Sequence, residues 1–333
     1  MNHPHIKFHC ARMLLISMAL CISFSLLACT KQTSPLTKTG FYFDTVIAIS
    51  LYDSTDEALL DDCFALAKTY ENRFSKTVEG SDIWNINHAN AQPIEVHEDT
   101  IELLQTALYY AELFDGKIDP TIGSVSQLWN FNNPTEASIP SANQLQDALM
   151  HVNYQTVTIK GNSVRLEDPA TELDLGFIAK GYIADQMKEY LVAHGVKSAT
   201  INLGGNVLTI GSKPDGSPFR IGIQKPFADS GITALTLSVT DKSAVSSGNY
   251  ERYFEKDGVC YHHILDTQTG YPVQNDLSSV TILSDSSVEG DALSTACFIL
   301  GSKQGMSWIE KQPGIEAVFI KTDGSILYSS GLN

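Results

Sequence analysis

The stretch D-A-L-S-T-A-C-F-I-L-G, residues 291–301, joins one acidic and two hydroxyl side chains to an apolar run typical of a buried helix. Residues four apart lie on one face of a helix, so Asp291 and Thr295 share a face. Carboxylate and hydroxyl oxygens suit a hard cation such as Mg²⁺. An acidic residue at a helix start is also stabilising by itself. These residues alone therefore leave both a helix cap and a metal site open.

Outward from this stretch, helices and strands are interspersed without a regular strand–helix–strand alternation. The β-branched and aromatic segment 41–53 predicts a strand, and Ser54 with Glu57 predicts a capping box for a helix to about Ser75. Further helices are predicted at about 99–116, from 177 to 194, from about 291, and near 303–311. The pattern favours an α+β fold: a single interwoven, two-lobed domain with mixed or antiparallel sheets and packed helices.

The composition limits the function classes. Of the 333 residues, 43% are hydrophobic, so the chain can bury a core, and only 18% are charged, which argues against disorder. The formal net charge of -16 excludes nucleic acid as an expected partner, because phosphate backbones are bound by basic patches.

The N-terminus predicts a bacterial lipoprotein signal. Lys7 and Arg12 precede an apolar segment, 13–28, that ends in a small residue followed by Cys29, the predicted lipidated residue. An ordinary secretory signal or an uncleaved anchor is the alternative. The predicted parts are a signal peptide at 1–28, the lipidated cysteine with a polar tether at 29–40, and the folded domain at 41–333.

Three cysteines remain in the predicted domain: Cys63, Cys260 and Cys297. They are widely spaced and form no C-x-x-C pair, which matches neither a zinc site nor a disulfide framework. The expectation is free, buried thiols, with one disulfide as the alternative.

Three segments combine glycine with polar residues in ways that suit an anionic ligand. In L-D-L-G-F-I-A-K-G-Y-I-A-D-Q, residues 173–186, glycines and Lys180 frame a helix start, where the helix dipole attracts negative charge. Asp119 and Thr121 lie at a turn that could hold a ligand oxygen or only cap the chain. The pair Gly204-Gly205 either makes a hairpin turn or lets a ligand approach the backbone.

A histidine pair precedes the turn D-T-Q-T-G at 266–270. Neighbouring residues of a strand point to opposite faces, so His262 and His263 cannot serve the same site. His263, close to Asp266, is a candidate general base. A structural histidine bonded to the turn is the alternative.

Eight segments in this order resemble the ApbE family, the FAD:protein FMN transferases, over about residues 40–330. They are T-G-F-Y-F-D-T-V-I-A-I-S-L-Y, N-R-F-S-K-T-V-E-G-S-D-I-W-N-I-N, D-P-T-I-G-S-V-S-Q-L-W-N-F, L-D-L-G-F-I-A-K-G-Y-I-A-D, I-N-L-G-G-N-V-L-T-I-G, A-V-S-S-G-N-Y-E-R-Y-F, H-H-I-L-D-T-Q-T-G-Y-P-V and E-G-D-A-L-S-T-A-C-F-I-L-G.

The resemblance implies an extracytoplasmic, membrane-anchored lipoprotein enzyme, on the periplasmic or cell-surface side. Such an enzyme uses Mg²⁺ to split the pyrophosphate of its substrate FAD. FMN is then attached through a phosphoester bond to a Thr or Ser of an acceptor flavoprotein, and AMP leaves.

The resemblance also implies site residues. The metal ligands would be Asp291, Thr295 and the backbone carbonyl of Phe177, with Ser294 where some members carry another acid and bind a second metal. His263 would activate the acceptor hydroxyl, with Asp266 beside it. The FAD pocket would comprise Phe43, Thr77, Asp119, Pro120, Thr121, Asp174, Lys180 and Leu265.

Two departures from the family pattern affect the FAD pocket. The family's Met-Gly-Thr reads Phe43-Asp44-Thr45, and Lys76-Thr77 stands where many transferases carry a tyrosine. These departures leave two alternatives open. One is Mg²⁺-dependent hydrolysis of FAD to FMN and AMP, and the other is a lipoprotein that binds flavin without turnover.

Overall fold

The computed structural model describes residues 34–131, 138–229 and 231–332. Leu36–Asn333 form one compact unit. The predicted signal peptide, Cys29 and the tether residues 30–33 lie outside the described residues. The rest of the predicted tether is described, and its residues 36–40 form part of the first strand of the fold, because they pair with a second strand. No helix within the described ranges is long and apolar enough to cross a membrane.

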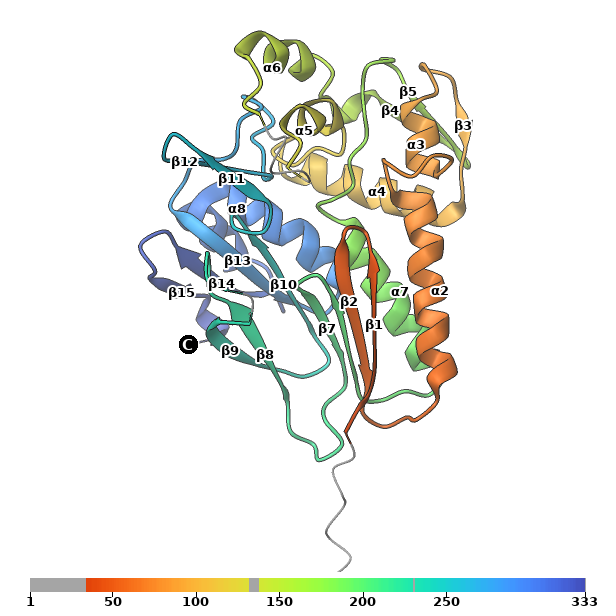
Figure 1. Ribbon diagram of the computed structural model, residues 1–333, viewed down its shortest axis with the longest axis vertical. Helices are drawn as coiled ribbons and strands as arrows, with labels where there is room; N and C mark the ends of the chain where they lie inside the picture. The colour runs from red at the N-terminus through yellow and green to blue at the C-terminus, as the bar shows by residue number, and fades with distance from the viewer. Residues whose placement is uncertain (1–33, 132–137, 230, 333) are drawn as a thin grey trace, which may run out of the picture. The chain divides into compact units, whose positions relative to one another are not determined.

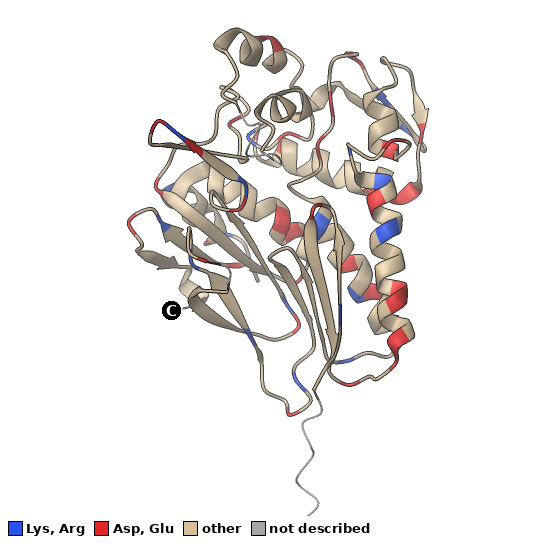
Figure 2. Cartoon of the chain, in the orientation of Figure 1, with Lys and Arg blue, Asp and Glu red and all other residues tan. Residues whose placement is uncertain are grey.

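An antiparallel sheet of eight strands is the framework of the unit (Figure 1). One interior strand, β13 (Leu277–Ser284), is buried along its whole length and carries no charged residue. Figure 2 shows that charged residues gather on the helices and loops, and few lie on these strands. In spatial order the strands are β1 (Leu36–Tyr42), β2 (Thr45–Leu51), β6 (Ala199–Leu203), β7 (Asn206–Ile210), β10 (Ser243–Gly248), β13 (Leu277–Ser284), β14 (Glu316–Lys321) and β15 (Ile326–Tyr328).

Three helices cover one face of this sheet: α2 (Glu57–Phe74), α7 (Ala179–Ala193) and α8 (Ser287–Ile309). Helix α8 packs on β10 and β13, and α7 packs against α8, α2 and β7. Gly290 of α8 lies so close to β10 that a Cβ there would be 2.9 Å from Val245 Cγ2. Helix α8 bends at Gly301, where φ is 76° and ψ is 170°, which accounts for the two helical segments predicted from the sequence.

The other face of the sheet is covered by the hairpin of β8 (Phe219–Gln224) and β9 (Thr233–Val239). Successive side chains of a strand point to opposite faces of the sheet, so a strand covered on both faces needs apolar residues at neighbouring positions. Strand β10 has such a pair. Ala244 belongs to the apolar cluster under the hairpin, whereas Val245 faces α8. Both faces of the sheet are therefore buried at β10.

The second lobe contains four further helices and a three-stranded sheet. Its aromatic cluster centres on Trp129, which stacks on Phe131 and Tyr261 and donates from Nε1 to the Gly270 carbonyl at 2.8 Å. The elements are α3 (Asp82–Asn87), β3 (Ile94–Glu95), α4 (Glu98–Leu113), α5 (Gly123–Trp129), α6 (Ala142–Leu149), η1 (Tyr154–Thr156), β4 (Val157–Lys160), β5 (Ser163–Leu166), and the hairpin β11 (Tyr253–Lys256) and β12 (Val259–His262). The C-terminal η2 (Ser330–Leu332) instead packs on β14 of the large sheet.

The predicted α+β fold with antiparallel sheets and packed helices is confirmed, and two predicted helix starts are wrong. Asp56 caps α2 by accepting from the Ala58 amide at 3.0 Å, because its carboxylate reaches the free amides that Ser54 does not. Helix α8 begins at Ser287 with Ser286 as its cap, so Asp291 lies within the helix.

All three cysteines of the described residues are free, as predicted, and the predicted burial is confirmed for two of them. Cys63 and Cys297 are buried, and Cys260 is half-buried. Burial raises the pKa of the Cys63 and Cys297 thiols to about 12, so both remain protonated and unreactive at neutral pH.

Candidate functional site

Helices α7 and α8 cap each other. Asp291 of α8 accepts from the Gly181 amide of α7 at 2.9 Å. Asp185 of α7 accepts from the Ser287 and Val288 amides of α8, each at 2.8 Å. Each carboxylate thus satisfies amides that the first turn of the other helix leaves without partners. A Cβ on Gly181 would lie 2.3 Å from the Ser287 carbonyl oxygen, so only glycine permits this approach.

Asp291 is the centre of a buried polar cluster and is itself only 2% exposed. The Lys180 ammonium lies 3.4 Å from its Oδ1 atom. Ser247 of β10 brings a hydroxyl 2.8 Å from Ser294 Oγ and 3.2 Å from Thr295 Oγ1. The structure therefore joins one carboxylate, one ammonium and three hydroxyls from α7, α8 and β10.

The donor set of this cluster fits Mg²⁺, because its uncharged and anionic donors are all oxygens. Phe177, whose carbonyl is the third predicted ligand, is half-buried and lies two residues before α7. No group of three or more His, Cys, Asp or Glu side chains suited to a metal occurs in the part of the chain that the structure describes. Among the predicted ligands Asp291 supplies the carboxylate, and hydroxyl and carbonyl oxygens would complete the site.

Ser294 is fully engaged within the protein. Its hydroxyl donates to the Asp291 carbonyl at 2.9 Å and lies 2.8 Å from the Ser247 hydroxyl. Ser294 is completely buried, whereas Thr295 is half-buried. Of the two hydroxyls predicted as ligands, Thr295 is the better placed to meet a ligand from solvent.

A second polar cluster surrounds Asp174. Its Oδ2 atom accepts from Lys76 Nζ at 2.6 Å and from Ser126 Oγ at 2.8 Å, and Lys76 Nζ also lies 2.8 Å from Ser126 Oγ. Oδ1 accepts from the Gly176 amide at 3.0 Å. Burial opposes ionisation, but the Lys76 ammonium and these hydrogen bonds outweigh it and hold the pKa of Asp174 well below its usual range.

Asp119 and Thr121 form a closed turn. Asp119 accepts from the Thr121 amide and hydroxyl, and from the Tyr154 amide at 3.0 Å. The Thr121 hydroxyl in turn accepts from the Asn153 amide at 2.8 Å. Burial raises the pKa of Asp119 despite these bonds. Pro120 connects this turn to the second cluster, since its carbonyl accepts from the Asp174 amide at 2.7 Å.

The two histidines have different surroundings. His262 is buried, with Nε2 3.0 Å from the Val273 carbonyl, while Nδ1 accepts from the Ile264 amide at 3.3 Å. His263 Nδ1 is buried and has no hydrogen-bond partner. Burial, with Arg252 and Lys180 nearby, lowers the pKa of His263 to about 3. His263 is therefore a neutral imidazole whose Nδ1 atom is available to a ligand, but so low a pKa makes it a weak base in this arrangement.

The remaining predicted residues lie apart from these clusters. Asp266 accepts from the Gln268 amide at 2.7 Å within its own turn, and no bond joins it to His263 among the described contacts. Leu265 is buried in the aromatic cluster around Trp129. Phe43 is in the left-handed region of the β1–β2 turn, with φ 54°, and its amide donates to Glu71. Thr77 is exposed and bonds to Ser75.

Three residues were absent from the predicted site: Ser247, Lys76 and Ser126. Each reaches its cluster from another part of the chain, so spacing within a motif could not reveal it. Lys76 alone carried a signal, because the pair Lys76-Thr77 stands in a segment singled out from the sequence.

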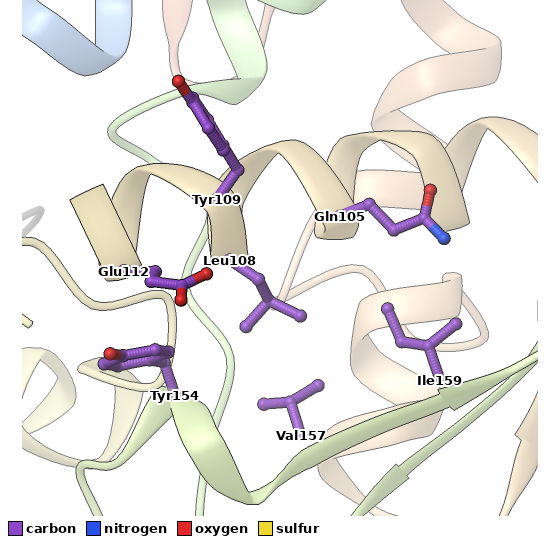
Figure 3. A pocket seen from close by; sticks show the side chains of 7 residues that line it. All are labelled: Gln105, Leu108, Tyr109, Glu112, Tyr154, Val157 and Ile159. Carbon is purple, nitrogen blue, oxygen red and sulfur yellow. The ribbon is translucent and has the colours of Figure 1, made fainter.

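An apolar groove between α4 and β4 contains none of the predicted site residues (Figure 3). Leu108 of α4 faces Val157 and Ile159 of β4 across it. Gln105, Glu112 and Tyr154 add polar groups at its walls. The groove belongs to the second lobe and offers none of the metal ligands or cations described above.

Acid should destabilise the fold through His262. Burial lowers its pKa to about 4, below the ordinary 6.5, so between these pH values the unfolded chain binds the extra proton. The free energy of unfolding should then fall by about 1.4 kcal/mol for each pH unit below 6.5 from this residue. Denaturant unfolding of wild type and His262→Leu between pH 7 and 4.5 should show a shallower pH slope in the variant. Parallel slopes would mean that His262 is charged in the native state.

Comparison with known proteins identifies the family of the chain. The sequence pattern of the ApbE family matches residues 43–319. The FAD:protein FMN transferase of Klebsiella pneumoniae (strain 342) is 39% identical over 287 residues, covering 85% of this chain and 88% of that protein. The enzyme of the same name from Treponema pallidum (strain Nichols) is 35% identical over 291 residues, covering 83% and 80%.

Solved structures show the same fold. The ApbE protein of Thermotoga maritima superposes with a TM-score of 0.82 at 32% identity, covering 90% of this chain and 98% of that one. The flavin transferase ApbE of Vibrio cholerae superposes with a TM-score of 0.79 at 27% identity, covering 89% and 97%. The chain described here belongs to the ApbE family.

Proposed function

We propose that this protein transfers FMN from FAD to a Thr or Ser hydroxyl of an acceptor flavoprotein, in an Mg²⁺-dependent reaction that releases AMP. The observation that carries the proposal is the buried Asp291 carboxylate, which shares one cluster with Lys180 and the Thr295 hydroxyl. Relatives named FAD:protein FMN transferase support the assignment of substrate and product.

Asp291, Thr295 and the Phe177 carbonyl would hold the metal. Bound Mg²⁺ would neutralise charge on the FAD pyrophosphate and make its phosphorus more electrophilic. The Gly181 amide fixes Asp291 before any ligand arrives, so little reorganisation is needed. Lys180, in the first turn of α7, adds a positive charge where the helix dipole also favours a phosphate.

His263 would take the proton of the acceptor hydroxyl. A new P–O bond then forms between the hydroxyl oxygen and the FMN phosphorus, and the P–O bond to the AMP phosphate breaks with its electron pair. His263 is neutral, and so able to accept a proton, from mildly acidic to basic pH, and the negative charge of a bound pyrophosphate would raise its low pKa. FMN thus becomes a phosphoester of the acceptor and AMP is the leaving group.

The N-terminal sequence supports an extracytoplasmic place for this reaction. Cleavage before Cys29 and its lipidation would tether the enzyme to a membrane. The acceptor would then be a flavoprotein exposed on the same side.

The proposed reaction is tested with the domain beginning after Cys29, FAD, Mg²⁺ and a candidate acceptor. Mass spectrometry should detect an FMN phosphoester on one Thr or Ser of the acceptor, with an equal amount of AMP in solution. FMN and AMP without an adduct would instead establish FAD hydrolysis. Tight FAD binding with no AMP release would identify a flavin-binding lipoprotein.

A further inference from the structure

We propose that Lys76 is the positioning residue of the FAD site: it holds Asp174, and through Asp174 the loop that leads into α7. This inference rests on the proposed function, because it takes FAD as the ligand.

The contacts of Lys76 connect three segments of the chain. Lys76 follows α2, Ser126 belongs to α5, and Asp174 precedes α7. Their three mutual distances are 2.6, 2.8 and 2.8 Å, so each group touches both of the others. The side chains of Lys76 and Asp174 are only 27% and 22% exposed, which limits screening of their charges by water.

Asp174 passes this constraint on to the proposed FAD site. Its amide is bonded to the Pro120 carbonyl, and its Oδ1 atom accepts from the Gly176 amide, which fixes the loop on both sides of the residue. Phe177, whose carbonyl is a proposed metal ligand, follows Gly176 directly, and Lys180 lies three residues further on, within α7. A change in the direction of Asp174 would therefore move these groups together.

The pairing also keeps Asp174 ionised. A carboxylate can accept hydrogen bonds from N–H or O–H groups of FAD, which a protonated carboxyl accepts less well. Without the Lys76 ammonium, the half-buried Asp174 would lose the largest of the interactions that lower its pKa. FAD affinity would then acquire a pH dependence that the wild-type enzyme does not show.

The test is a titration of FAD into Mg²⁺-free protein, followed by flavin fluorescence, so that binding is measured without turnover. Lys76→Met should raise the Kd for FAD at least tenfold at pH 7, and the loss should grow as the pH falls to 5. Lys76→Arg keeps the charge and should stay within threefold of wild type. With Mg²⁺ present, Lys76→Met should raise KM by a similar factor and change kcat little.

A double-mutant cycle separates positioning from direct contact. In an Asp174→Asn background, Lys76→Met should have less than a threefold further effect on Kd. An equally large effect in both backgrounds would mean that Lys76 binds FAD itself and would overturn the inference. Lys68→Met removes an exposed lysine, paired with Glu71 in α2, and serves as the matched control.

The failures are distinguishable. If wild type does not bind FAD, the proposed function is wrong. If wild type binds FAD and Lys76→Met binds it equally well, only the present inference is wrong. Circular dichroism checks the fold, and Ser126→Ala, which removes the shared hydroxyl but no charge, should raise Kd about two- to fivefold if Lys76→Met does not fold.

Discussion

Asp291→Asn is expected to lower the rate of AMP release from FAD by about 100- to 1,000-fold, the usual loss when a group that stabilises transition-state charge is removed. Asparagine is also a good acceptor at a helix start, so the bond to the Gly181 amide can persist. The variant should therefore fold, bind FAD nearly as well as wild type, and lose its response to Mg²⁺. Steady-state kinetics across a range of Mg²⁺ concentrations measure this directly.

Asp185→Asn is the matched control for this prediction. Asp185 makes the reciprocal cap, accepting from the Ser287 and Val288 amides, but no candidate ligand or cation of the proposed metal site bonds to it in the described structure. Both variants should lose similar stability, about 1 kcal/mol, in denaturant unfolding. Only Asp291→Asn should lose activity. Equal activity in the two variants would make Asp291 a structural cap and remove it from the metal site.

His263→Ala should slow FMN transfer to an acceptor by about 100-fold or more, a loss typical of a missing general base. The rate of FAD hydrolysis should fall less than the rate of transfer, because the base is positioned for the acceptor hydroxyl and not for an attacking water. The ratio of adduct to free FMN, measured by mass spectrometry and chromatography in the same reaction, should shift toward free FMN.

The ratio of adduct to free FMN serves as an internal control, because a loss of folded protein would lower the amounts of both products equally. Since burial lowers the pKa of His263 to about 3, protonation of this residue should not limit transfer between pH 5 and 8. An equal loss of transfer and hydrolysis would assign His263 to the structure of the site. If the rate of FMN transfer changed with pH near 6.5 in wild type but not in His263→Ala, the His263 ring would be exposed to solvent.

Local patterns predicted the parts of this fold and site that depend on neighbours in sequence. The spacing of Asp291 and Thr295 placed both on one helix face, because helical geometry fixes residues four apart. They do lie in one polar network, in which Ser294 and Ser247 link the Asp291 carbonyl to the Thr295 hydroxyl. The two helical segments divided at Gly301 were likewise readable from the sequence. The start of α7 between two glycines was also predictable, because it too depends on residues that are neighbours in the sequence.

Contacts between distant segments were not predictable from such patterns. The bond from Gly181 to Asp291 spans 110 residues, and the ion pair of Lys76 with Asp174 spans 98. Nothing in the local sequence states that Asp291 would cap another helix and not its own. Strand order has the same difficulty, because β10 pairs with β7 and β13, and period-two alternation does not identify a partner.

The mutual capping of α7 and α8 also constrains how such an enzyme can evolve. A carboxylate that serves only catalysis can be exchanged when a new substrate demands it, with little effect on folding. Asp291 does not have that freedom, since it also closes the first turn of a helix that starts more than a hundred residues earlier. Lineages that change their acceptor protein should therefore diversify the surface around this pair of helices while retaining the pair itself.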